Sequence, residues 1–77
     1  MNKYDFINYA AKRYGIDESM AETMVDMFAS SLQELIGAGQ NITIDEIGTF
    51  VTTSLFNKKM VSFKASSQLT NDVQKYH

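Results

Sequence analysis

The sequence has no cysteine, no proline and no tryptophan, and its single histidine, His77, is the last residue. Without cysteine there is neither a disulfide nor a thiolate metal site, and one terminal histidine does not supply a cluster of metal ligands. That histidine is also a poor general base because chain ends fray, so nucleophilic catalysis lacks its usual partner. These absences predict a protein that is not an enzyme and that uses no metal or other cofactor.

The sequence also lacks any apolar run long enough to cross a bilayer, and its first residues, Met-Asn-Lys-Tyr-Asp, lack the apolar core of a signal peptide. We therefore expect a cytoplasmic protein with no membrane partner. In that compartment the sequon Asn41-Ile42-Thr43 is a chance match, because glycosylation needs a secretory context.

The chain is short, with 77 residues, which predicts a single domain over 1–77. Hydrophobic residues make up 44% and charged residues 21% of the sequence, a composition typical of globular proteins. A core built from so few residues leaves much apolar surface uncovered, and no disulfide or metal reinforces it. Dimerisation is the expected source of the missing stability.

Charge is divided unevenly along the chain, although the net charge is only −2. Residues 1–50 hold three basic and eight acidic residues, a net −5, whereas residues 51–77 hold four lysines and one aspartate, a net +3. An acidic total argues against indiscriminate binding to nucleic acid, but the basic C-terminal part can still present a positive face to an anion.

Two helices are expected in the first half. Asn2 is a good N-cap, apolar residues recur at helical spacing over about 3–14, and Gly15 supplies the left-handed residue that ends a helix. Asp17 is expected to cap a second, longer helix that stops near 37–39.

The apolar period then changes from helical to extended. Strands are expected at 42–44, from 47 to about 56, and at 60–63, with a turn at Asp45-Glu46 and a polar break at 57–59. Ser66 or Ser67 then caps a short last helix with an apolar side formed by Leu69, Val73 and Tyr76. The predicted class is α+β: two N-terminal helices, a three-stranded antiparallel sheet and a C-terminal helix.

The second helix invites two further interpretations. As the recognition helix of a helix-turn-helix it would need basic or amide side chains facing the bases, but residues 18–36 contain no lysine or arginine and four acidic residues. Met20, Met24 and Met27 occupy successive turns, which favours a core or dimer interface over an adaptable partner surface.

An ordered set of short segments resembles the HU/IHF family of bacterial histone-like architectural DNA-binding proteins over almost the whole chain. The segments are Met1-Asn2-Lys3, Phe6-Ile7-Asn8, Gly15-Ile16, Phe28, Gly39, Gly48-Thr49-Phe50, Phe63-Lys64-Ala65, Leu69 and Val73. The resemblance implies an intertwined homodimer, with paired helices as a base, the sheets as a saddle, and two β-ribbon arms that enter the minor groove. It implies a shared dimer core containing Phe28, Leu32, Phe50 and Phe63.

The expected arm departs from the family pattern. Only residues 51–62 separate Phe50 from Phe63, whereas the family's arms are longer, rich in basic residues and tipped by a proline that wedges between bases. About five residues per leg at ~3.4 Å each give a hairpin of ~17 Å, too short to wrap a duplex. Kinking by the family's route is therefore not expected.

Four lysines are candidates for contacts with DNA phosphates: Lys3, Lys58, Lys59 and Lys64. They make eight contacts in a dimer if all lie on one face, which would give strongly salt-dependent binding. The leading hypothesis is an HU-like dimer that binds double-stranded DNA weakly and non-specifically and is then nucleoid-associated. The alternatives are a dimerisation or decoy module that pairs with itself or with a full-length HU-like subunit, and a lysine pair at 58–59 that only keeps the hairpin soluble.

Overall fold

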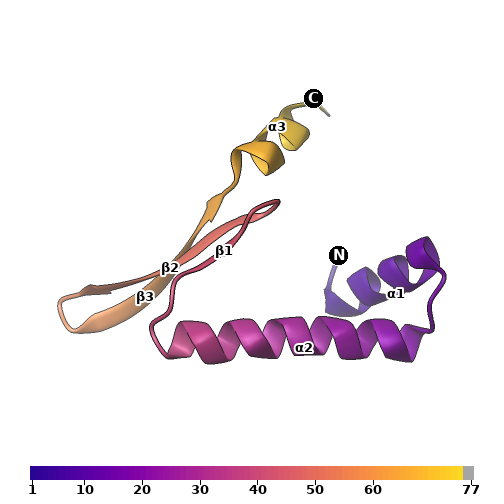
Figure 1. The fold of residues 1–77 in the computed structure, drawn as a ribbon, viewed down its shortest axis with the longest axis horizontal. Coiled ribbons are helices and arrows are strands. Elements are labelled where there is room, and N and C mark those ends of the chain that lie inside the picture. Colours follow the sequence, from indigo (N-terminus) through magenta and orange to yellow (C-terminus); the bar gives the residue numbers. More distant parts are fainter. Residues whose placement is uncertain (76–77) are drawn as a thin grey trace. The chain divides into compact units, whose positions relative to one another are not determined.

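The computed structural model describes residues 1–75, so Tyr76 and His77 lie outside the described residues. The elements are α1 (Lys3–Tyr14), α2 (Glu18–Gly37), β1 (Ile42–Ile44), β2 (Gly48–Leu55), β3 (Lys58–Ala65) and α3 (Ser67–Lys75) (Figure 1). This is the α+β order that the sequence predicts. The chain forms two compact units, residues 1–31 and the part from Leu32 onward. No helix in the described residues is long and apolar enough to span a membrane.

Helix α1 covers the predicted residues 3–14 because both of its ends are capped by nearby residues. The Asn2 side chain accepts a hydrogen bond from the Asp5 backbone N–H at 2.9 Å, and the Asp5 carboxylate accepts one from the Asn2 backbone N–H at 3.3 Å. This reciprocal capping box satisfies two donors that the first helical turn leaves free. At the other end Gly15 adopts the left-handed conformation, with φ 65°, and donates to the Ala11 carbonyl.

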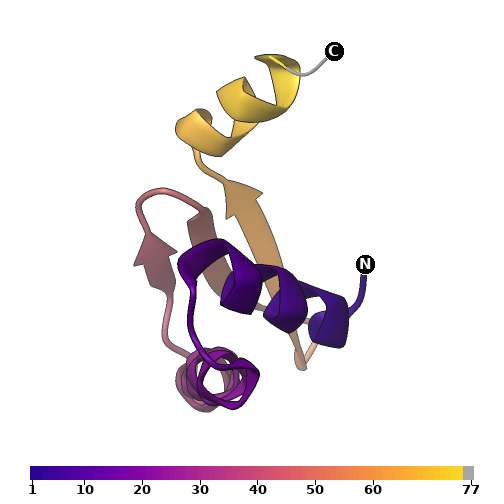
Figure 2. The same ribbon diagram turned by 90° about the vertical axis from the view of Figure 1, so that its right-hand side faces the viewer.

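The first unit has a small core between α1 and the beginning of α2. The two helices lie side by side there (Figure 2). Ile7 and Ala11 of α1 are buried with Ala21 of α2, and Ile16 and Val25 pack against them. Large side chains on α2 stay outside this core, since Phe28 is 50% exposed.

The second unit contains an antiparallel sheet in the order β1-β2-β3. Strand β1 pairs only with the first three residues of β2, from Ile44↔Gly48 to Ile42↔Phe50. Strands β2 and β3 then continue as a two-stranded ribbon beyond the pair Phe50↔Phe63, with five more residues on each leg (Figure 1). Each leg thus has the five residues that the sequence predicts, which at ~3.4 Å each correspond to ~17 Å.

The tip of the ribbon differs from the expected polar break at 57–59. Phe56 and Asn57 form the turn, with φ of 52° and 64°, and Lys58 and Lys59 are the first residues of β3. Two central residues with positive φ suit the right-handed twist of the strands, which is why short hairpins favour this turn. Polarity alone placed the turn too late, because lysine is tolerated in a solvent-exposed strand.

Helix α3 begins at the predicted cap. The Ser66 hydroxyl accepts a hydrogen bond from the Leu69 N–H at 3.0 Å and donates one to the Glu46 carbonyl at 3.1 Å. The Ser66 backbone N–H also donates to the Ile47 carbonyl at 2.8 Å. Ser66 therefore both caps α3 and attaches its start to the turn between β1 and β2.

Candidate nucleic-acid interface

The register of the ribbon decides which lysines share a surface. Side chains of directly paired residues lie on the same face of a sheet, and successive residues alternate between faces. Lys58 pairs with Leu55 and Lys64 pairs with Thr49, so these two lysines, six residues apart, lie on one face. Lys59 pairs with Ser54 and lies on the opposite face.

The face that carries Lys58 and Lys64, here called the Lys58/Lys64 face, is polar where all three strands meet. Thr43 of β1 pairs with Thr49 of β2, which pairs in turn with Lys64 of β3. The hydroxyls of Thr43 and Thr49 lie 3.1 Å apart. A row of two hydroxyls and an ammonium group offers hydrogen-bond donors of the kind that contact phosphate oxygens.

The opposite face, here called the phenylalanine face, is apolar in the same three-stranded part. Ile42, Phe50 and Phe63 form its central row, and the two phenylalanine rings have centroids 4.9 Å apart with an angle of 48° between their planes. Phe63 remains 46% exposed. An aromatic row that is only half covered has apolar surface available for a partner chain.

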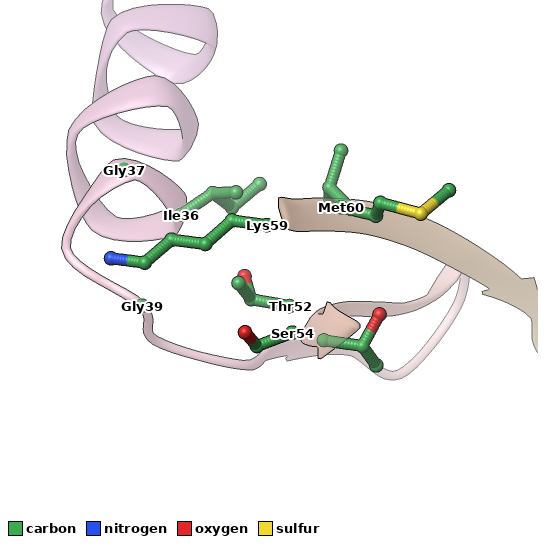
Figure 3. A pocket seen from close by; sticks show the side chains of 9 residues that line it. Ile36, Gly37, Gly39, Thr52, Ser54, Lys59 and Met60 are labelled. Carbon is green, nitrogen blue, oxygen red and sulfur yellow. The ribbon is translucent and has the colours of Figure 1, made fainter. Parts of the chain in front are cut away.

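Lys59 lies on the phenylalanine side and faces the end of a helix. It lines a cavity of about 320 Å³ together with residues of the α2 end and of the ribbon, among them Ile36, Gly37, Gly39, Thr52 and Ser54. Figure 3 shows its side chain extended toward the turn that follows α2. The last turn of α2 has no basic residue of its own, and a cation there interacts favourably with the helix dipole.

Lys3, the fourth candidate, belongs to the first unit and has an acidic neighbour. Its ammonium group forms an ion pair with the Asp26 carboxylate on α2. The hydrogen bond with Asp26, together with the attraction between the two charges, raises the pKa of Lys3 above its ordinary value of 10.5. A phosphate that binds Lys3 must compete with this carboxylate.

The three lysines of β3 have no acidic residue near them in the sequence. No aspartate or glutamate occurs between Glu46 and Asp72, so residues 47–71 carry a charge of +3 from their three lysines. The condition for eight contacts per dimer is nevertheless not met on β3, because Lys59 faces away from Lys58 and Lys64. Strand β3 brings two lysines per chain to one face.

One prominent residue of this region was missed in the sequence. Phe56 occupies the first position of the turn at the ribbon tip and is 90% exposed. Counting outward from the pair Phe50↔Phe63 leaves Phe56 and Asn57 as the central residues, and asparagine is one of the residues that tolerates positive φ. That count was the available signal.

Comparisons with known proteins agree with this geometry. Residues 1–55 match the family model described as bacterial DNA-binding protein, so the match ends with the last residue of β2. No curated protein matches the chain. Three solved structures have the same fold and align with 95% of the chain.

These three structures are all of HU proteins. A point mutant of HU from Thermotoga maritima is 26% identical with a TM-score of 0.87 and is covered over 99% of its chain. HU from Thermotoga maritima is 23% identical, with a TM-score of 0.83 and 98% coverage. HU from Anabaena, in a cocrystal with DNA, is 18% identical, with a TM-score of 0.78 and 97% coverage.

The fold is thus that of the HU architectural DNA-binding proteins. The chain belongs to the bacterial DNA-binding protein family, the family of HU.

Proposed function

We propose that this chain acts, without catalysing a reaction, as an HU-like homodimer that binds duplex DNA weakly and without sequence preference in the nucleoid of the cytoplasm. The observation that carries the proposal is the Lys58/Lys64 face, where two lysines lie beside the Thr43 and Thr49 hydroxyls. Such groups contact phosphates, which position a protein on DNA but carry no sequence information.

The proposed dimer is supported by the apolar surface that the single chain leaves uncovered. Phe28 is 50% exposed and Phe63 is 46% exposed, while Leu32 and Phe50 are only partly buried. Among the described residues, the buried hydrophobic core consists of three small or medium side chains, those of Ile7, Ala11 and Ala21. We therefore keep Phe28, Leu32, Phe50 and Phe63 as the proposed dimer core, in which each chain covers the other.

The short ribbon supports binding without strong bending. Five residues per leg beyond Phe50 and Phe63 reach ~17 Å, which does not carry a chain around a duplex. Bending is repaid when a bent duplex meets more protein surface, and this ribbon offers little.

The test is fluorescence anisotropy of a labelled duplex of about 20 base pairs, titrated with the protein at salt concentrations from about 50 to 200 mM. Four lysines per dimer on the Lys58/Lys64 faces predict a slope of log K against log salt of about −4, or roughly 200-fold weaker binding over this range. Light scattering is expected to give twice the chain mass of 8.7 kDa. An absence of binding at ~50 mM salt would overturn the proposal.

A second candidate function is that of a subunit that pairs with a full-length HU-like chain and leaves the mixed dimer with one short arm. The exposed phenylalanine face beside so short a ribbon favours it. Native mass spectrometry of a mixture with HU from Thermotoga maritima tests it. Mixed dimers are the expected result for this second function, and homodimers alone would count against it.

A further inference from the structure

Strand β3 has one edge that is not paired with another strand of the described chain. In the sheet order β1-β2-β3 it is an outer strand, and every residue from Lys58 to Ala65 is exposed. The backbone N–H of Thr52 in β2 donates to the Asn41 side chain, which directly precedes β1, so Thr52 points away from β3. In an antiparallel pair both residues of such a position point away from each other, and the partner of Thr52 is Val61. The N–H and C=O of Val61 therefore face outward.

The outward backbone groups form a regular row along this edge. Paired positions alternate along an antiparallel ladder, so Lys59 and Phe63, two residues to either side of Val61, direct their N–H and C=O outward as well. In the part of the chain that the structure describes, no backbone hydrogen bond beyond the β2–β3 pairing reaches these groups. Such a row of free donors and acceptors is a template for a further strand.

Most devices that protect a sheet edge are missing from β3. The sequence has no proline, and the register runs from Gly48↔Ala65 to Leu55↔Lys58 without a bulge. The device that is present is charge, from three lysines within eight residues. Positive charge excludes some strands from an edge and attracts others.

A second copy of β3 is a poor occupant of this edge. If two copies paired antiparallel about Val61, Lys58 of each would lie opposite Lys64 of the other, and like charges directly opposite are destabilising. Residues 47–71 hold no acidic side chain that could compensate. A strand with acidic side chains at the same positions has the charge that complements the edge.

We propose that the free edge of β3 binds an extended, acidic segment of a partner protein as an additional strand of the sheet. Acidic side chains of this segment lie opposite Lys58 and Lys64 on one face and opposite Lys59 on the other. Between them, β-branched or aromatic side chains cover Val61 and Phe63, which lie on the phenylalanine face and are 56% and 46% exposed.

This inference goes beyond the proposed DNA binding and does not depend on it. A duplex brings negative charge to the same lysines, but it has no row of amides and carbonyls that pairs with a strand edge. Because the acidic segment occupies Lys58 and Lys64, it is expected to compete with duplex DNA wherever the protein binds both. The edge thus gives a partner protein a means of releasing DNA from the Lys58/Lys64 face.

A designed peptide tests the proposal with the intact protein. The peptide Thr-Glu-Val-Thr-Val-Thr-Glu-Glu, blocked at both ends, pairs antiparallel with its first residue opposite Ala65, which places its glutamates opposite Lys64, Lys59 and Lys58. Fluorescence anisotropy of the labelled peptide at ~50 mM salt is expected to show saturable binding. The control Glu-Glu-Glu-Thr-Thr-Thr-Val-Val has the same composition and charge but the wrong positions, and it is expected to bind roughly tenfold more weakly.

Methylation of the peptide backbone separates strand pairing from simple charge attraction. The N–H groups of the two valines face β3 in this pairing, so methylating both nitrogens removes two hydrogen bonds and leaves the charge unchanged. The affinity is expected to fall roughly tenfold or more. The threonine after each valine directs its N–H away from β3, and methylating those two nitrogens is the matched control, expected to change the affinity less than about threefold.

A variant of the protein gives the reciprocal test. Val61→Pro removes an outward N–H without breaking the β2–β3 ladder, a position at which an edge strand tolerates proline. Its affinity for the peptide is expected to fall roughly tenfold, while its duplex binding changes less than about twofold because no charge is altered. Val61→Thr keeps the N–H and is the control, expected to bind the peptide within about twofold of the parent protein.

Hydrogen exchange locates the bound peptide on the strand. The peptide is expected to slow exchange of the Lys59 and Phe63 amides by roughly tenfold or more, while the Met60 amide, which faces β2, changes little. This measurement uses the parent protein and so does not depend on the folding of a variant.

The outcomes separate this inference from the proposed function. If the duplex binds but the designed peptide does not, or both methylated peptides bind equally well, strand addition is overturned and the proposed function stands. If the Lys59 and Phe63 amides become protected with rising protein concentration alone, a second copy covers the edge and strand addition is overturned. If the peptide binds in the expected register while the duplex does not bind at ~50 mM salt, the inference stands and the proposed function fails.

Discussion

At the scale of single residues, the ion pair between Lys3 and Asp26 controls whether Lys3 is free to contact phosphate. Asp26 lies on the same helix as Glu22, which adds a smaller attraction to the same ammonium group. Both effects favour the protonated lysine and so raise its pKa. While Asp26 is ionised, the pair's contribution to stability is fully present below pH 10.5, and it is lost as the pH rises through the raised pKa of Lys3.

Asp26→Asn is expected to lower the pKa of Lys3 toward its ordinary value, which an NMR titration of the lysine side chain would show. If Lys3 contacts phosphate, the same substitution is expected to strengthen duplex binding about threefold at ~50 mM salt, since the competing carboxylate is gone. Glu34→Gln, on the same helix, removes an equal charge and is the matched control. Equal effects from both variants would show that only net charge matters and that Lys3 makes no contact.

At the scale of elements, the sheet depends on one close approach between β2 and β3. Gly48 has φ 151°, and a Cβ there would lie 2.2 Å from the Lys64 carbonyl oxygen and 2.9 Å from the Phe63 ring. No side chain fits without displacing the β3 backbone. Gly48 thus lets the strands pair at the base of the ribbon and keeps Phe63 in its row on the phenylalanine face.

Gly48→Ala is expected to destabilise the protein by about 3 kcal/mol, because backbone strain and overcrowding each contribute about 1–3 kcal/mol. Urea unfolding followed by circular dichroism measures the change. Gly37→Ala is the control, since a Cβ at that position meets nothing within 4 Å, and it is expected to be neutral or slightly stabilising. Equal stability of the Gly48 variant and the parent protein would show that β3 shifts easily.

Local signals made the helices predictable, and the lack of a local signal explains the errors in the ribbon. The bounds of α1 follow from Asn2, Asp5 and Gly15, whose effects reach only a few residues. The faces of Lys58 and Lys59 depend on the register of two strands, and a shift of one residue would exchange them. The sequence alone identified the lysines as candidates but did not show which of them lie on the same face of the sheet.

At the scale of the whole molecule, an acidic chain of 77 residues is proposed to bind a polyanion because its charge is unevenly distributed. The part of the chain before Ile47 holds eight of the nine acidic residues, while lysines are the only charged residues of the ribbon. Weak attraction to phosphate with little reach is the combination expected of a protein that binds duplex DNA without wrapping it. The fold that carries the Lys58/Lys64 face is the fold of the family to which the chain belongs.

The central claim, that the Lys58/Lys64 face is the phosphate-binding surface, is tested most directly by comparing salt slopes of charge variants in the duplex assay. The double variant Lys58→Ser with Lys64→Ser is expected to lose most of the slope of about −4, because it removes four contacts per dimer. Lys59→Ser, on the other face, is expected to keep a slope within about one unit of the parent value. A slope that falls equally per lysine removed in all variants, or falls most in Lys59→Ser, would contradict the account.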